Sequence, residues 1–127
     1  MIYLYLPSTF LFDIINPIIK KILFICSANK DRSRTAEDHF QEVFPEQVFE
    51  SAGTNQVICD QEGTTYMSKE LLDAATHIFV METKHQQAIT KKFGNAFFQK
   101  ISVLHIKDHF QYGSKELIHI LEQKVQL

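Results

Sequence analysis

A cysteine and an arginine stand six positions apart, at the point where an apolar segment gives way to polar residues. Cys26 follows the apolar run 22–25, and Arg32 is followed at once by Ser33, a residue type that often begins a helix. The residues between them would form a loop that opens into a helix N-terminus. Free backbone N–H groups and the positive end of the helix dipole favour an anion there. The pattern therefore predicts an anion-binding loop that contains a thiol.

A thiol and a guanidinium around a bound anion suggest phosphoryl transfer through sulfur. A helix N-terminus and a nearby arginine favour the thiolate, which is the reactive form of cysteine. Cys26 would attack phosphorus and form a covalent intermediate, and Arg32 would grip two phosphate oxygens. Ser33 would donate a hydrogen bond to the thiolate. The anion would be held by the loop N–H groups of Ser27, Ala28, Asn29, Lys30, Asp31 and Arg32.

Cys26 taken alone favours a plainer interpretation, a buried cysteine at the end of a strand. The arginine, the serine and the helix that follow it reverse this preference. The segment is not a nucleotide-binding loop, because that motif requires glycines and the chain has none before residue 53.

The segment from Cys26 to Ser33, continued by Thr35-Ala36-Glu37, resembles the signature of the low-molecular-weight protein tyrosine phosphatases, in particular their short bacterial branch. Two later segments, 51–54 (Ser-Ala-Gly-Thr) and 78–82 (Ile-Phe-Val-Met-Glu), match as well. The resemblance covers roughly residues 20–125. It implies a hydrolase of phosphotyrosine proteins or small aryl phosphates that works through a phosphocysteine and needs neither metal nor cofactor.

Such a reaction also needs a general acid that protonates the leaving group. Asp108 is the candidate, because it follows the last predicted strand at its carboxyl end. The resemblance implies an Asp-Pro pair at this place, followed by aromatic residues that flank the substrate ring. Asp108, Phe110 and Tyr112 fit that pattern, whereas His109 replaces the proline. The alternative interpretation of Asp108 is a turn residue before the last helix.

Three positions in the predicted loop and helix, Asp31, Arg34 and Asn29, lead to specific predictions. Asp31 stands where relatives often carry cysteine or a neutral residue, and an inward carboxylate would repel phosphate; we expect it to point outward. Arg34 replaces the proline that the family usually has in the first turn of the helix. Asn29 is expected to fix the shape of the loop, because asparagine tolerates left-handed backbone conformations.

Apolar runs and helical periodicities alternate along the chain. Strands are predicted at 21–26, 48–51, 77–81 and 101–104, helices at 33–44, 68–75, 83–93 and 114–125, and a loop at 53–66. This order predicts a three-layer α/β/α sandwich with a central, mainly parallel four-stranded sheet. Ligands bind at the carboxyl ends of strands in such sheets, and Cys26 ends one of them.

The composition is that of an ordinary globular protein, with 45% apolar and 22% charged residues. We expect one phosphatase-like domain at 20–127. A net charge of −2 argues against nucleic-acid binding. The two cysteines, Cys26 and Cys59, form no disulfide framework, and a nucleophile must stay reduced, so we expect a cytoplasmic location. The basic residues expected around the site are Lys20, Lys21, Lys30, Arg32 and Arg34.

Residues 1–19 form an apolar extension that precedes the region of resemblance. Prolines at 7 and 17, with Asp13 and Asn16, interrupt the roughly 20 apolar residues that a membrane span needs, and a short helix at 8–16 fits between the prolines. We rank three interpretations of its role: an arm packed on this chain or a partner, a peripheral membrane contact, and a wrongly assigned start codon.

Three functions are compatible with these residues. A phosphatase is preferred. A phosphate-binding or phosphotyrosine-binding module that has lost turnover is second, because of Asp31 and His109. An arsenate reductase on the same fold is third, because it would require Cys59 to relay a disulfide. The six histidines share no metal-ligand spacing, so no metal site is predicted. The physiological substrate and the oligomeric state stay open.

Overall fold

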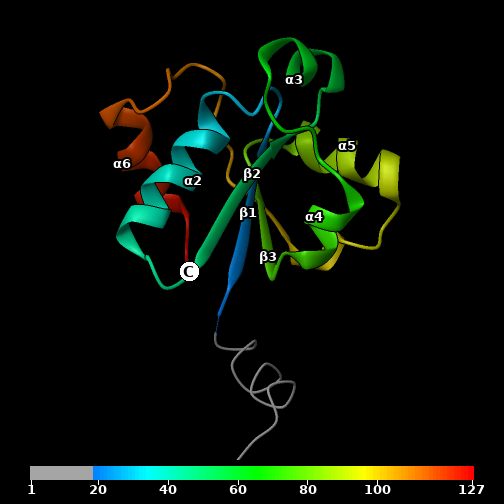
Figure 1. The fold of residues 1–127 in the computed structure, drawn as a ribbon, viewed down its shortest axis with the longest axis horizontal. Helices are drawn as coiled ribbons and strands as arrows, with labels where there is room; N and C mark the ends of the chain where they lie inside the picture. The colour runs from blue at the N-terminus through cyan, green and yellow to red at the C-terminus, as the bar shows by residue number, and fades with distance from the viewer. Residues whose placement is uncertain (1–18) are drawn as a thin grey trace, which may run out of the picture.

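The computed structural model describes residues 19–127, which form three layers around a sheet of four parallel strands (Figure 1). The strands are β1 (Lys21–Cys26), β2 (Val48–Gly53), β3 (His77–Val80) and β4 (Ile101–Val103). They lie in the order β2-β1-β3-β4, and every pairing is parallel. The predicted strands are confirmed to within two residues at each end.

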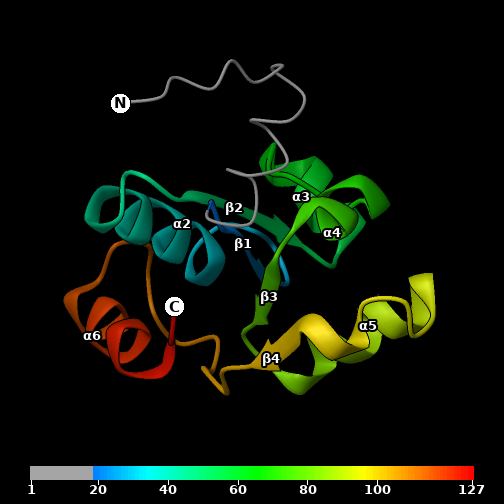
Figure 2. The same ribbon diagram turned by 90° about the horizontal axis from the view of Figure 1, so that it is seen from below.

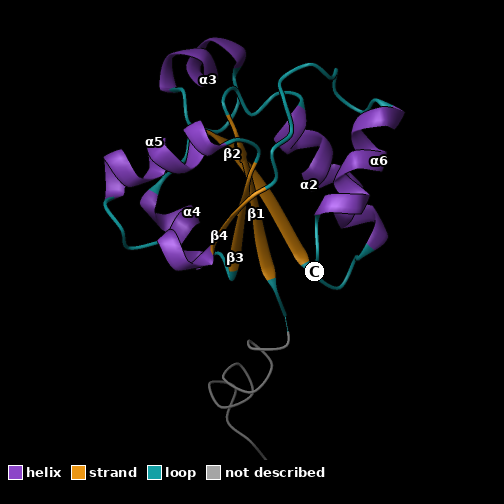
Figure 3. Ribbon diagram, turned by 180° about the vertical axis from the view of Figure 1, so that it is seen from behind, coloured by secondary structure: helices purple, strands orange, loops and turns teal. Residues whose placement is uncertain are grey.

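Within the described residues, two helices cover one face of the sheet and three cover the other (Figures 2 and 3). α2 (Arg32–Val43) and α6 (Lys115–Lys124) lie on one side; α3 (Gln56–Glu62), α4 (Lys69–Ala74) and α5 (Thr83–Phe93) lie on the other. A short 3-10 helix, η1 (Phe98–Lys100), precedes β4. The predicted three-layer α/β/α sandwich is confirmed.

The strand β1 lies at the centre of the molecule and contributes to both apolar cores. Ile22, Phe24 and Cys26 belong to the core beneath α2 and α6, whereas Leu23 and Ile25 belong to the core beneath α4 and α5. All five are at most 3% exposed. Parallel strands covered on both faces are apolar throughout, which is why this run was readable as a buried strand.

The segment 53–66, predicted as a loop, contains the helix α3, so that prediction is wrong. Asn55 begins α3 by accepting a hydrogen bond from the Ile58 N–H at 3.1 Å, and Gly63 ends it with a φ of 70°. Cys59 is the one buried residue of α3. Seven residues with one buried side chain have no apolar stripe that periodicity could detect.

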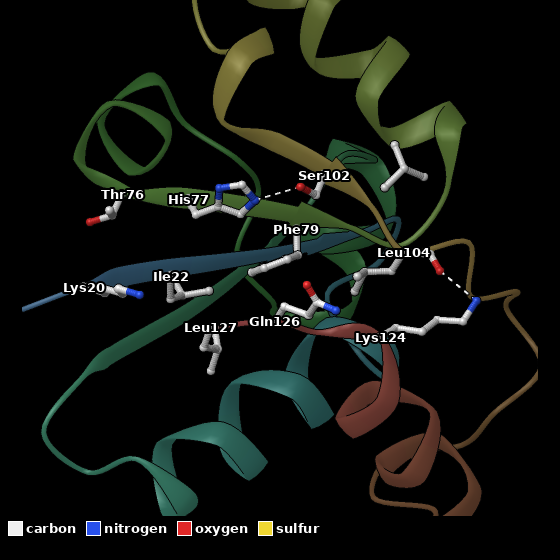
Figure 4. Close-up of a pocket in the computed structure, with 11 residues that line it drawn as sticks. Lys20, Ile22, Thr76, His77, Phe79, Ser102, Leu104, Lys124, Gln126 and Leu127 are labelled. Atoms are coloured by element: carbon white, nitrogen blue, oxygen red, sulfur yellow. Dashed lines mark hydrogen bonds between the residues drawn. The ribbon is translucent and has the colours of Figure 1, made fainter.

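The predicted gathering of basic residues around Cys26 is wrong for Lys20 and Lys21. Both lie at the amino end of β1, whereas Cys26 ends the strand, roughly 17 Å away at about 3.3 Å per residue. Lys21 forms an ion pair with Glu50 at 2.9 Å. Lys20 lines a cavity of about 420 Å³ at the amino end of the sheet (Figure 4).

The predictions for the extension 1–19, including the short helix at 8–16, concern residues 1–18, which lie outside the part of the chain that the structure describes. Over residues 19–127, no helix has both the length and the apolar composition that a membrane crossing requires.

Candidate active site

Cys26 ends β1, and the five residues that follow it form a loop that leads into α2. The cysteine is 3% exposed, and its Sγ lies 3.0 Å from Ser33 Oγ. Ser33 also accepts a hydrogen bond from Asn29 Nδ2 at 2.9 Å. Because the serine oxygen is an acceptor for Asn29, its own proton is free to point at the sulfur. The structure therefore brings Cys26 and Ser33 within hydrogen-bonding distance, and either group can be the donor.

Asn29 fixes the middle of the loop. Its φ is 54°, in the left-handed region, and its buried side chain has partners on both sides. Besides Ser33, Nδ2 donates to Ser51 Oγ at 2.7 Å, and Oδ1 accepts from the Thr65 N–H at 3.1 Å. These bonds tie the loop to β2 and to the segment after α3, as expected for a residue that sets the shape of the loop.

The start of the loop rests on Gly53, the last residue of β2. A Cβ added there would lie 2.5 Å from the Ser27 carbonyl oxygen and 2.6 Å from Cys59 Sγ. The Ser27 carbonyl also accepts the Asn55 N–H at 3.0 Å. Cys59 is fully buried behind the loop, and this burial raises the pKa of its thiol. The close approach of backbone to backbone requires glycine at position 53.

Arg32 is held inside the protein by fixed partners. Its side chain is 2% exposed, and its Nη1 donates to Glu82 Oε2 at 2.5 Å and to the Ile106 carbonyl at 2.8 Å. The hydrogen bond from Arg32 holds the pKa of Glu82 below its ordinary value. A buried guanidinium clamped in this way keeps one orientation, which suits the gripping of an anion.

Asp108 lies at the rim of the site. Its Oδ1 is 3.7 Å from Arg32 Nε, and its side chain is 64% exposed. The candidate acid therefore lies beside the predicted phosphate-binding arginine, although 76 positions separate the two in the sequence. Its position is open enough for both a leaving group and water to reach it.

The segment that carries Asp108 is anchored on the first turns of α2. Asp31 Oδ1 accepts the Tyr112 N–H at 3.0 Å, and Thr35 Oγ1 accepts the Gly113 N–H at 2.9 Å. The Asp31 carboxylate thus points to this segment, in agreement with the expectation that it faces outward. The Tyr112 hydroxyl donates to Asp38, which raises the pKa of Tyr112.

The other predicted binding residues differ in their burial and in their contacts. Phe110 is half-buried and packs against the core beneath α2 and α6, whereas Tyr112 is 53% exposed. Lys30 lies 3.6 Å from Glu62 on α3, so its side chain is directed to that helix. The Ala28 carbonyl accepts a hydrogen bond from Thr64 Oγ1 at 2.6 Å.

Sequence reasoning missed two residues of the site, Glu82 and His85. Glu82 is the partner of Arg32 described above. His85 is fully buried; its Nε2 lies 2.8 Å from Ser27 Oγ, and its Nδ1 accepts the Glu82 N–H at 3.0 Å. Both residues follow the carboxyl end of β3, so the argument that placed Cys26 at this edge of the sheet would have flagged them too.

The site therefore combines a thiol, a hydroxyl, a guanidinium and an exposed carboxylate. Among residues 19–127, no three His, Cys, Asp or Glu side chains lie close enough together to hold a metal ion. The chemistry that this chain's own groups can perform is nucleophilic attack by sulfur on an anionic centre, with proton transfer at the rim.

Solved structures of bacterial phosphatases share this fold. The tyrosine phosphatase Wzb from Escherichia coli K30, in complex with phosphate, is 22% identical with a TM-score of 0.66, covering 84% of this chain and 93% of that chain. A low molecular weight protein tyrosine phosphatase from Streptococcus pyogenes is 16% identical (TM-score 0.58; 68% and 73%). The YwlE arginine phosphatase from Geobacillus stearothermophilus is 22% identical (TM-score 0.60; 82% and 89%).

No protein-family model and no curated protein sequence matches the chain. The solved structures establish that its fold is that of the low-molecular-weight protein tyrosine phosphatases. The resemblance seen in the segment from Cys26 to Ser33 is thus confirmed at the level of the fold.

Proposed function

We propose that this chain is a phosphomonoester hydrolase, a cysteine-dependent protein tyrosine phosphatase of the low-molecular-weight type. The observation that carries the proposal is the 3.0 Å contact between Cys26 Sγ and Ser33 Oγ, inside a loop that opens into the N-terminus of α2. A hydroxyl whose proton is directed at sulfur stabilises a thiolate. A cysteine that only fills a core needs no such donor.

In the first step, Cys26 Sγ attacks phosphorus, and an S–P bond forms as the bond to the leaving oxygen breaks. The loop N–H groups and Arg32 bind the other phosphoryl oxygens, where negative charge is concentrated. Asp108 gives its proton to the leaving oxygen, so that a phenol or alcohol departs rather than an oxyanion.

In the second step, the Asp108 carboxylate takes a proton from a water molecule whose oxygen attacks phosphorus. The S–P bond breaks, inorganic phosphate leaves and the thiolate returns to its hydrogen bond with Ser33. Every atom that reacts comes from the chain, the substrate or water. Because the thiolate must stay reduced between cycles, a reducing compartment such as the cytoplasm suits the protein.

The substrate class we propose is aryl phosphate, including phosphotyrosine in proteins. Tyr112 is exposed beside the segment that carries Asp108 and can pack against an aromatic ring. The structural neighbours include a tyrosine phosphatase and an arginine phosphatase. Phosphotyrosine and phosphoarginine peptides should therefore be compared directly, and faster hydrolysis of phosphotyrosine is expected.

The test is hydrolysis of para-nitrophenyl phosphate between pH 5 and 7 in the presence of a chelator. Wild type should turn over, Cys26→Ser should not, and Asp108→Asn should be strongly slowed. Ser102→Ala, in β4 and bonded to His77 rather than to the anion loop, serves as the matched control and should resemble wild type. Substantial turnover by Cys26→Ser would overturn the assignment of the nucleophile.

A phosphate-binding module without turnover is the second candidate. The observation in its favour is the exposed Asp108, which His109 follows in place of proline. The concern about Asp31 is weaker, because its carboxylate is bonded to the Tyr112 N–H. Binding of inorganic phosphate by wild type without any hydrolysis would select this candidate. Loss of arsenate reduction in Cys59→Ala would instead support an arsenate reductase.

A further inference from the structure

His85 has a defined protonation state because both of its ring nitrogens have partners. Nδ1 accepts the Glu82 N–H at 3.0 Å, so it carries no proton. Complete burial, helped by the charge of Arg32, lowers the pKa of the ring to about 4. The ring is therefore neutral near pH 7, its proton is on Nε2, and Nε2 donates to Ser27 Oγ over 2.8 Å.

Ser27 is the first residue of the anion loop and follows the nucleophile directly. Its backbone carbonyl is held by the Asn55 N–H, and its hydroxyl is held by His85. Asn29 fixes the middle of the loop from the side of β2. His85 thus fixes the start of the loop from the opposite side, through α5.

The same turn of α5 also sets the direction of Arg32. Glu82 immediately precedes α5 and accepts the Arg32 guanidinium at 2.5 Å, while His85 is the third residue of that helix. One helical turn therefore holds both the start of the loop and the guanidinium, the two parts that must bind the same phosphoryl group.

We propose that His85 is a positioning residue for the reaction at Cys26, because its hydrogen bond to Ser27 fixes the anion loop against the helical turn that orients Arg32. This inference rests on the proposed phosphatase function. Loosening the loop weakens its grip on the transition state, where the phosphoryl charge is greatest, so kcat falls more than KM changes. It also weakens the stabilisation of the Cys26 thiolate by the anion loop and the N-terminus of α2.

A purely structural histidine would fill the same space and begin α5 without acting on the loop. Two substitutions separate these roles. In His85→Gln, the amide nitrogen reaches the place of Nε2 and keeps the donor to Ser27. In His85→Asn, the amide oxygen takes the place of Nδ1 and keeps only the acceptor for the Glu82 N–H. Ser27→Ala removes the same bond from the loop side and leaves the buried ring in place.

The experiment measures kcat and KM for para-nitrophenyl phosphate, together with the pH dependence of Cys26 alkylation by iodoacetamide, followed on the Cys26 peptide by mass spectrometry. We expect His85→Asn and Ser27→Ala to lower kcat on the order of tenfold, the effect of one buried hydrogen bond. In both, the alkylation midpoint should move to higher pH. His85→Gln should stay within about threefold of wild type.

His77→Gln is the matched control. His77 Nε2 lies 2.9 Å from the Ser102 hydroxyl, and this histidine–serine pair is outside the anion loop. This variant should leave both readouts unchanged. Equal behaviour of His85→Asn and His85→Gln, or a Ser27→Ala variant with the wild-type kcat and alkylation profile, would overturn the inference. Absence of turnover in wild type would remove the proposed function, and the alkylation profiles would then decide the inference alone.

Discussion

The two ends of the sheet each hold a histidine that is hydrogen-bonded to a serine, and the two pairs differ in their neighbours. At the amino end, His77 is bonded to Ser102 beside the cavity of about 420 Å³ (Figure 4). At the carboxyl end, His85 is bonded to Ser27 in the loop that carries Cys26. Burial lowers the pKa of both rings. The local bond is the same, so the difference in chemistry must come from the surroundings.

Helix direction is the main difference between the surroundings. In a parallel α/β sheet the helices begin at the carboxyl edge, where their free N–H groups attract anions. α2 and α5 both begin there; Cys26 ends β1 at the same edge, and Arg32 is the first residue of α2. The amino end has the larger cavity, whereas the pocket beside Glu82 and Lys107 measures about 290 Å³. Cavity size therefore does not mark the end of the sheet that carries Cys26, whereas the convergent helix N-termini do.

The largest contrast is expected between two basic residues, one at each end. Arg32→Lys keeps a charge but removes the planar fork that donates to Glu82 and Ile106 and that, in the proposed mechanism, would bind two phosphate oxygens. We expect kcat/KM to fall roughly a hundredfold, as when one preorganised donor is lost. Lys21→Met, which removes a half-buried ion pair with Glu50 at the other end of β1, should change kcat/KM by less than about twofold. Steady-state kinetics of both variants checks this, and equal losses would contradict the comparison.

A second contrast uses glycines inside and outside the site. In Gly53→Ala the new Cβ would meet the Ser27 carbonyl at 2.5 Å, so the loop must shift. We expect roughly tenfold slower turnover and about 1–3 kcal/mol lower stability from overpacking. At Gly63, with φ +70°, nothing lies within 4 Å; Gly63→Ala should cost about 1 kcal/mol from its backbone conformation and leave turnover unchanged.

Chemical denaturation and kinetics of the two glycine variants measure these effects. A Gly53→Ala variant with wild-type turnover would show that the loop does not depend on the close approach at β2.

A third contrast concerns acid stability. The pKa of His85 is about 4 in the folded protein and 6.5 when unperturbed, so between these values the unfolded chain binds more protons. The free energy of unfolding should therefore fall as the pH drops from 6.5 to 4, by up to a few kcal/mol. The charged groups that act on His85 are Arg32, Glu82, Lys84 and Asp108. The two histidine variants compared below keep all of them.

Denaturant unfolding at a series of pH values measures this slope. His85→Gln should flatten it more than His77→Gln does, because the His77 ring is only half-buried. Equal slopes for the two variants would contradict the assignment of a buried neutral imidazole to position 85.

The smallest effect is expected at the rim. Tyr112→Phe removes the exposed hydrogen bond to Asp38 but keeps the ring, so kcat/KM for an aryl phosphate should change less than about threefold. Tyr112→Ala removes the ring and should raise KM more. Similar KM values for the two variants would mean that the ring does not flank the substrate.

The fold was largely predictable because the two central strands, β1 and β3, are nearly continuous apolar runs, and helical periodicities alternate with the strands. The helix α3 was not, since Cys59 is its one buried residue. The loop that brings the thiol, the guanidinium and the hydroxyl together could be predicted because Cys26, Arg32 and Ser33 lie within eight residues of sequence. The spacing of residues along the sequence predicts a site when a single loop contains its residues.

The rest of the site depends on contacts between distant segments. Glu82 lies 50 positions from Arg32, and Asp31 meets Tyr112 across 81 positions. Such pairings follow from strand order and loop length, which composition does not encode. The same limit explains the misplacement of Lys20, which is near Cys26 in sequence but at the opposite end of β1.

In the proposed mechanism Cys26 carries the phosphoryl group, and this role can be tested by trapping the phosphocysteine. Para-nitrophenolate departs without protonation, so Asp108→Asn should form phosphocysteine but hydrolyse it slowly. Acid-quenched protein, digested and analysed by mass spectrometry, should then carry one phosphoryl group on the Cys26 peptide and none in the Cys26→Ala/Asp108→Asn variant. Turnover without any phosphorylated Cys26 peptide, or phosphate found on another residue, would contradict the account.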